Sequence, residues 1–132
     1  MRDYEDMQAY IEISDAQIIF LQKYPHPWSF LGKRKSSFSL PGYMSSEQYT
    51  QISLRVAENC INANIRDNIK YPLFLTSANT SGHPESSTLE GARAYFPQIY
   101  GFDGGMCDSL PSDIFSIDEE GDLYYLRKNY SL

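Results

Sequence analysis

The residues best suited to chemistry lie in one loop, residues 76–82 (TSANTSG), which follows the apolar run at residues 73–75. The apolar run predicts a short buried strand, and loops at the carboxyl ends of strands are where open α/β sheets bind ligands. Small side chains leave backbone N–H groups accessible, so this loop suits an anion such as phosphate or carboxylate. The candidates are Ser77, Asn79 and Ser81. The alternative is that these polar groups satisfy the backbone of their own loop.

Two further polar side chains are candidates, and each has an ordinary structural alternative. Arg55 belongs to residues 51–56, where polar and apolar residues alternate as in a half-buried strand. Its alternative is a surface arginine on the solvated face of that strand. Ser112 follows Pro111 directly before another predicted strand, where a serine commonly belongs to a turn.

The histidines and cysteines give no metal or catalytic signal. His26 and His83 each lie beside proline in predicted loops, and neither has a partner at metal-ligand spacing. Cys60 and Cys107 are far apart, which predicts reduced thiols in a cytoplasmic protein. The sequence contains no Ser/His/Asp order, P-loop or GxGxxG motif. We therefore expect no resident metal and no nucleophilic triad.

Length and charge restrict the possible classes of protein. The 132 residues suit a single domain with its own core. A net charge of −6 argues against strong nonspecific nucleic-acid binding, which depends on Lys and Arg neutralising phosphates. The basic run at residues 32–37 predicts a solvated loop or strand end, with a phosphate contact as its alternative. No apolar run approaches the ~20 residues that span a bilayer, and the acidic amino terminus does not resemble a signal peptide.

Hydrophobic periodicity predicts helices that alternate with strands. We expect helices at residues 3–13, 15–24, 59–69 and 86–96, and strands at residues 28–31, 51–56, 73–75, 113–117 and 123–127. The last two strands form a hairpin around residues 119–121. This order predicts an α/β (α+β) fold with a twisted mixed β-sheet flanked by helices in two or three layers.

Local signals mark the ends of several of these elements. Ser14 or Asp15 can cap the second helix. Ser87 and Glu90 have the spacing of a capping box at the start of the last helix. The Pro-Gly pair at residues 41–42 marks a turn. A stripe along one face of the third helix is predicted from Ile61, Ile65 and Ile69.

Taken together, these motifs resemble the YrdC-like domain of the threonylcarbamoyl-AMP synthase family. Residues 72–82 match the most diagnostic stretch of that family, Pro-Leu-x-x-Thr-Ser-Ala-Asn-x-Ser-Gly, at every defined position. Four weaker segments follow the family in the same order. Residues 25–29 resemble its Pro-Gly-Pro-x-Thr and residues 52–56 its Val-Arg-Ile-Pro. Residues 104–105 with 110–112 resemble its closing Gly-Gly … Pro-Ser-Thr-Ile, and residues 125–127 its final Ile-Leu-Arg. The resemblance extends from near residue 4 to near residue 129.

The resemblance implies an adenylate-forming reaction. In that family threonine and bicarbonate give N-carboxy-threonine, whose carboxyl attacks the α-phosphate of ATP. The products are pyrophosphate and threonylcarbamoyl-AMP, which is used to modify tRNA adenosine 37 (t6A). The resemblance places Arg55 and Ser29 at the threonine or the intermediate. It assigns contacts with the nucleotide, with Mg²⁺ shared, to Ser77, Asn79, Ser81 and Ser112.

Several departures accompany the resemblance. The family domain begins with strands that carry a Pro-Thr-Glu-Thr segment and a Lys-x-Arg motif, which supply the threonine pocket and the main cationic clamp on the triphosphate. Here Met1 falls after both, and residues 33–35 lie on the wrong side of residues 25–29 to replace the motif. Smaller departures include Ala57 for Pro and Asn129 for the terminal Gly.

From these departures we expect an amino-terminally truncated domain whose sheet lacks the first strands of the family and exposes an unpaired edge. Two hypotheses follow. The chain is the carboxy-terminal part of a synthase that is inactive without a complementing protein half. Alternatively, it is a non-catalytic remnant that binds nucleotide, RNA (including double-stranded RNA) or a partner protein. The acidic net charge does not favour RNA.

Overall fold

The computed structural model of the chain describes residues 1–39, 49–57, 63–68 and 70–131. It divides into two compact units. One, here called the sheet unit, comprises Met1–Leu73 and Pro111–Leu132. The other, here called the loop unit, comprises Phe74–Leu110.

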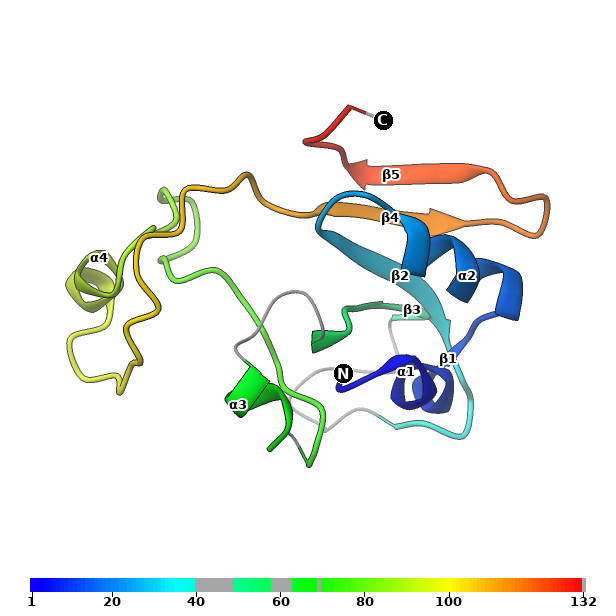
Figure 1. Cartoon of the computed structure of the whole chain (residues 1–132), viewed down its shortest axis with the longest axis horizontal. Coiled ribbons are helices and arrows are strands. Elements are labelled where there is room, and N and C mark those ends of the chain that lie inside the picture. The colour runs from blue at the N-terminus through cyan, green and yellow to red at the C-terminus, as the bar shows by residue number, and fades with distance from the viewer. Residues whose placement is uncertain (40–48, 58–62, 69, 132) are drawn as a thin grey trace. The chain divides into compact units, whose positions relative to one another are not determined.

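The sheet unit contains a five-stranded mixed sheet (Figure 1). Its strands are β1 (Ile11–Glu12), β2 (Trp28–Arg34), β3 (Gln51–Leu54), β4 (Asp113–Ile117) and β5 (Leu123–Arg127). The order is β1-β2-β4-β5, with β3 paired to β2 off this path. β2 and β4 run parallel, and the other pairs are antiparallel. The predicted mixed sheet, with the two late strands as a hairpin, is confirmed.

Two short helices precede β2, and local capping explains where each begins. α1 (Tyr4–Tyr10) is capped by Asp3, whose side chain accepts from the backbone N–H of Asp6. α2 (Asp15–Lys23) begins with a capping box, in which Ser14 and Gln17 exchange hydrogen bonds. The two predicted helices are therefore confirmed. The chain leaves the first of them early, because residues 11–12 pair with the end of β2 instead.

The core lies between these helices and one face of the sheet (Figure 1). Successive residues of a strand point to opposite faces, so Trp28 and Phe30 of β2 lie on the same side as Phe115 of β4. The buried cluster consists of Met7, Ile11, Leu21, Tyr24, Trp28, Phe30, Val56 and Phe115. A Cβ at Gly32 would lie 2.3 Å from Ile11 Cδ1 and 2.9 Å from Ile11 Cβ, so a glycine at this position lets β1 pack against β2.

The apolar run at residues 73–75 does not form the predicted buried strand, and that prediction is wrong. Leu73, Phe74 and Leu75 have no strand assignment and are 49%, 76% and 56% exposed. Pro72 before them has no N–H to donate to a ladder. Among the described residues no strand pairs with this run, so its apolar character alone does not produce a strand.

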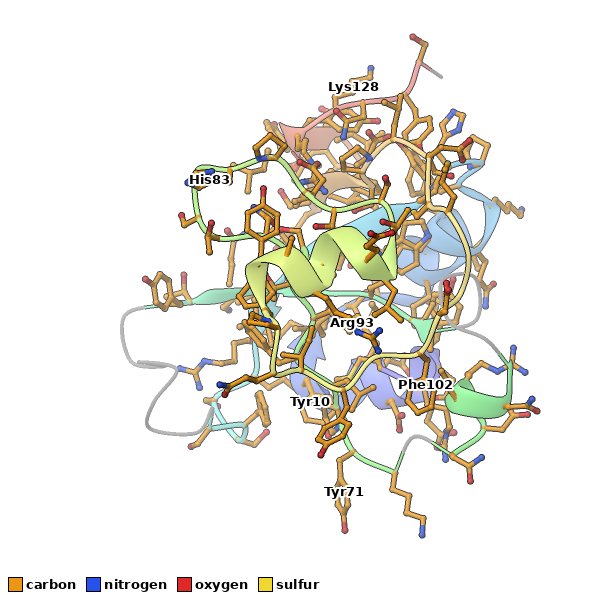
Figure 2. All side chains as sticks on the ribbon, turned by 90° about the vertical axis from the view of Figure 1, so that its left-hand side faces the viewer. Tyr10, Tyr71, His83, Arg93, Phe102 and Lys128 are labelled. Atoms are coloured by element: carbon orange, nitrogen blue, oxygen red, sulfur yellow. The ribbon has the colours of Figure 1, made fainter. Side chains whose placement is uncertain are left out.

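The loop unit is built around one helix, α4 (Leu89–Tyr95). Its N-cap is Thr88, whose hydroxyl accepts from the backbone N–H of Gly91 at 3.1 Å. The predicted capping box at Ser87 is therefore wrong, because the helix begins one residue later. Figure 2 shows His83 on the segment before α4 and Phe102 on the segment after it. Phe102 is 92% exposed, so little of this segment is buried.

The remaining predictions of local structure fall partly outside the described residues. α3 (Ala63–Arg66) lies within the predicted third helix, and Ile65 on it is 44% exposed. Ile61 and Ile69 of the predicted stripe, Cys60 and the turn at residues 41–42 lie outside the described part of the chain. In the described ranges, no helix is both long and apolar enough to cross a membrane.

Candidate functional site

The centre of the candidate site is the pair of Arg55 and Ser29, which the register of β2 and β3 places side by side. Phe30 pairs with Leu54, so the next antiparallel pair along the ladder brings Ser29 opposite Arg55. The guanidinium of Arg55 donates to the Ser29 hydroxyl from Nε at 3.2 Å and from a terminal nitrogen at 2.8 Å. Both residues lie on the face of the sheet opposite the helices, since Phe30 and Leu54 point toward the core.

Ser112 joins this pair from the residue just before β4. Its hydroxyl oxygen lies 3.2 Å from that of Ser29, and Arg55 donates to it at 2.5 Å. Ser112 and Ser29 are only 5% and 7% exposed, whereas Arg55 is half-buried. The structure thus brings together three residues that the resemblance assigned to two different ligands, threonine and nucleotide. Their ligands stay predictions.

Arg127, at the end of β5, completes the group and was missed as a site residue from the sequence. Its Nε donates to the Ser112 carbonyl at 2.8 Å, and a terminal nitrogen donates to the Ser112 hydroxyl at 3.2 Å. The β4–β5 ladder shifts register between Ile114 and Phe115, and this shift places Arg127 opposite Ile114. The motif at residues 125–127 could have indicated Arg127 as a site residue. Its position beside Ser112 could not be predicted, because the sequence does not show the register shift.

The electrostatics of this group favour an anion. Two guanidinium groups, from Arg55 and Arg127, converge on the hydroxyl of Ser112. Over the described residues, the ion pairs of the chain are Arg2 with Asp3 and Asp6, Lys33 with Glu12, and Arg66 with Asp67. Neither site arginine therefore has a carboxylate partner in this part of the chain. Two neighbouring cations without a counter-charge are stabilised by a bound carboxylate or phosphate. We call Ser29, Arg55, Ser112 and Arg127 the two-arginine site.

The basic run at residues 32–37 is engaged elsewhere in the sheet unit. Lys33 pairs with Glu12 at 2.8 Å across β1 and β2. Arg34 donates to the Phe38 carbonyl, and Lys35 donates to the Gln8 carbonyl at 2.6 Å. β2 includes residues up to Arg34, so the strand-end interpretation is confirmed.

In the loop unit, the amide of Asn79 is bonded to its own loop. Its Nδ2 donates to the carbonyls of Thr80 at 3.1 Å and His83 at 2.8 Å. Gly82, with φ of +82°, supports the turn in which His83 donates to Thr80 at 3.1 Å. This bonding is what the structural alternative for the loop predicted. Ser77 and Ser81 are exposed, and the buried Oδ1 of Asn79 has no partner among the described residues. The role of the loop in nucleotide binding stays a prediction.

The histidines have local structural contacts. His26 Nε2 lies 3.0 Å from the Ser131 carbonyl, and its ring stacks on Tyr130 at 4.7 Å. His83 makes an edge contact with the ring of Tyr95, with the ring centroids 6.2 Å apart. Across the described ranges, no group of three or more His, Cys, Asp or Glu could hold a metal ion.

One hollow of the sheet unit does not coincide with the two-arginine site. It has a volume of about 480 Å³ and is lined by residues of β1, the start of α2 and the β4–β5 turn, including Glu12, Gln17, Lys33 and Glu120. None of the predicted site residues lines it. The two-arginine site is recognised by its hydrogen bonds and charge.

The mixed sheet, with helices on one face and clustered cations on the other, is that of an α+β YrdC-like domain. A family model agrees: the Sua5/YciO/YrdC model, described as telomere recombination, matches residues 1–128. The chain therefore belongs to the Sua5/YciO/YrdC family, and the resemblance identified from the motifs is confirmed. This family is linked in general with threonylcarbamoyl-AMP synthase. No curated protein matches the sequence significantly.

Proposed function

We propose that this chain supplies the carboxylate- and nucleotide-binding side of a threonylcarbamoyl-AMP synthase. The observation that carries the proposal is the convergence of Arg55 and Arg127 on Ser112 without a carboxylate partner in the described part of the chain. Arg55 and Ser29 hold the carboxylate of threonine or of N-carboxy-threonine, which a planar guanidinium suits. Ser112 and Arg127 hold the nucleotide beside it.

The reaction needs positioning and charge neutralisation from these residues. The carboxyl oxygen of N-carboxy-threonine forms a bond to the α-phosphorus of ATP, and the bond to the β-phosphate bridging oxygen breaks to release pyrophosphate. Negative charge accumulates on the phosphate oxygens during this transfer, and guanidinium groups stabilise it. No nucleophilic side chain is required, which agrees with the absence of a triad motif from the sequence.

The loop at residues 76–82 supplies the second part of the proposal. Ser77, Asn79 and Ser81 contact the phosphates of ATP, which enters as its Mg²⁺ complex. Exposed hydroxyls at residues 77 and 81 favour this role. The Asn79 amide donates to two carbonyls of its own loop, so in this proposal Asn79 acts partly by fixing the shape of the loop.

The printed sequence contains neither Lys-x-Arg nor Pro-Thr-Glu-Thr. We propose that the 132-residue chain binds substrates without turning them over, and that another segment or a complementing protein supplies those motifs. A role in tRNA modification would place it in the cytoplasm. The second hypothesis, a non-catalytic remnant, shares the binding step and differs only in lacking a complementing protein. Direct RNA binding is not favoured, given the net charge of −6.

The test has two arms. Pyrophosphate release from the pure chain is measured with ATP, L-threonine and bicarbonate, and we expect none above background. Titration calorimetry with Mg²⁺–ATP is expected to detect weak binding that Asn79→Ala reduces. Threonine-dependent pyrophosphate release from the pure chain would overturn the claim that it needs a complement. No ATP binding, or equal binding by Asn79→Ala, would contradict the assignment of the loop.

A further inference from the structure

A buried carboxylate, that of Asp113, lies directly behind the two-arginine site. Asp113 is the first residue of β4 and is 0% exposed. Because neighbouring strand residues point to opposite faces, Asp113 points into the core while Ser112 points toward the site. Its carboxylate therefore does not pair with Arg55 or Arg127, and no ion pair of Asp113 occurs among the described residues.

The carboxylate of Asp113 joins α2 to the segment after β5. Its Oδ2 accepts from the phenol of Tyr24 at 2.6 Å. Its Oδ1 accepts from the backbone N–H groups of Asn129 at 2.6 Å and Tyr130 at 3.3 Å. Burial would raise the pKa of Asp113, but these hydrogen bonds outweigh burial and hold the pKa below its ordinary value. Among the described residues, the carboxylate thus accepts three hydrogen bonds.

The residues just before β4 are also bonded to the end of β5 and the segment after it. Asn129 Nδ2 donates to the Pro111 carbonyl at 2.8 Å, and Arg127 Nε donates to the Ser112 carbonyl at 2.8 Å. Among the described residues, Pro111 therefore accepts one bond from residues 127–130, and Ser112 and Asp113 accept two each. The bonds to Asp113 end on a carboxylate that is 0% exposed and lies on the core side of the sheet.

From this arrangement we propose that Asp113 is a positioning residue, whose carboxylate fixes the end of β5 so that Arg127 and Ser112 meet on the opposite face. The proposal rests on the proposed function for its ligand, but its geometric claim concerns Arg127 alone. Arg127 is exposed and its long side chain rotates about four bonds, so without a fixed backbone it would sample many directions. Acceptor geometry, not charge, is what the proposal requires of residue 113.

That requirement gives a pair of contrasting variants. Asp113→Asn keeps an oxygen for the N–H groups of Asn129 and Tyr130, and its amide can donate to the Tyr24 oxygen. Asp113→Ala removes every acceptor. The primary readout is the Nε–Hε signal of Arg127 in ¹⁵N-edited NMR spectra, assigned by its loss in Arg127→Lys. The Arg66 signal, from a guanidinium bonded only to Asp67 in the described part of the chain, serves as internal control.

We expect the Arg127 signal to shift or to exchange with water faster in Asp113→Ala, and to keep its position in Asp113→Asn. Binding of inorganic pyrophosphate, measured by calorimetry, is expected to weaken about tenfold in Asp113→Ala and to recover in Asp113→Asn. If Asp113→Ala does not fold, Tyr24→Phe tests the carboxylate itself, because it removes the phenol that donates to Asp113 Oδ2 and leaves the carboxylate less firmly held. We expect a smaller shift of the same signal.

The outcomes separate this inference from the proposed function. A folded Asp113→Ala with an unchanged Arg127 signal and unchanged affinity overturns the positioning role, as does an unchanged signal in Tyr24→Phe where only that variant folds. An Asp113→Asn variant that fails to recover the signal shows that charge matters and also overturns it. If the unmodified chain does not bind pyrophosphate, the proposed function loses its support, while the Arg127 signal still decides the role of Asp113.

Discussion

Replacing Arg55 with alanine should weaken ligand binding strongly while lowering the free energy of unfolding only slightly. Among the described residues, Arg55 donates three hydrogen bonds, all to the hydroxyls of Ser29 and Ser112. When they are lost, the two hydroxyls still contact each other at 3.2 Å, and Ser112 keeps its bond from Arg127. No buried hydroxyl is left without a partner, so the free energy of unfolding should fall by only about 1 kcal/mol.

The effect of Arg55→Ala on binding should be larger. A charge-assisted hydrogen bond to a carboxylate or phosphate contributes roughly 1.5–3 kcal/mol. At about 1.4 kcal/mol per tenfold change, losing that contact raises the Kd by roughly 10- to 150-fold. Arg55→Lys keeps the charge without the planar fork, so its Kd should lie between those of the unmodified chain and Arg55→Ala.

The assay is calorimetric titration with Mg²⁺–ATP in the presence of L-threonine and bicarbonate, together with urea unfolding of each variant. Arg66→Ala is the matched control, because it also removes one positive charge. Arg66 is the last residue of α3, and its guanidinium pairs with Asp67, the next residue. Its affinity should equal that of the unmodified chain. If Arg55→Ala and Arg66→Ala bind equally well, net charge explains the binding and the assignment of Arg55 is wrong.

Three further predictions concern stability. Gly32→Ala should lower the free energy of unfolding by roughly 1–3 kcal/mol, measured in urea, because the new methyl group would lie within 3 Å of Ile11 Cβ. Thr88→Ala should lower it by about 1 kcal/mol through loss of the N-cap of α4, while Thr88→Ser should retain most of it. The pKa of Asp113 is lowered in the folded state, so its contribution is present above its ordinary pKa of about 3.9 and is lost as the pH falls through the folded value. Asp113→Asn should therefore show a flatter decline in unfolding free energy below about pH 4; an equally steep decline would contradict this.

Local signals predicted most of the helices and strands of the sheet unit. The capping box at Ser14 and Gln17 and the period of the apolar residues are properties of neighbouring positions, so the sequence displays them directly. The strand expected at residues 73–75 was wrong because a strand also needs a partner ladder, which a sequence does not display. The helix at residues 3–13 was too long for the same reason, since pairing of Ile11 with Arg34 overrides local helical preference.

The candidate site was predictable only in part. Ser29, Arg55 and Ser112 were identified because they lie in motifs that follow one another in the same order as in the family. Their meeting depends on the register of β2 with β3 and of β2 with β4, which the sequence does not specify residue by residue. Arg127 could not be placed, because its position opposite Ile114 follows from a register shift in the hairpin.

The two-arginine site places two positive charges close together on a chain whose net charge is −6. Net charge governs long-range attraction of polyanions, and −6 disfavours nonspecific binding to nucleic acid. A small anion would instead be held by direct contacts, because salt screens the attraction between exposed charges beyond about 8–10 Å at physiological ionic strength. Arg55 and Arg127 both donate to the Ser112 hydroxyl, so their two positive charges lie close enough together to contact one small anion. The basic side chains of residues 33–35 are bonded elsewhere in the sheet unit. The charge distribution therefore favours selection of a single carboxylate or phosphate group over an extended phosphate backbone.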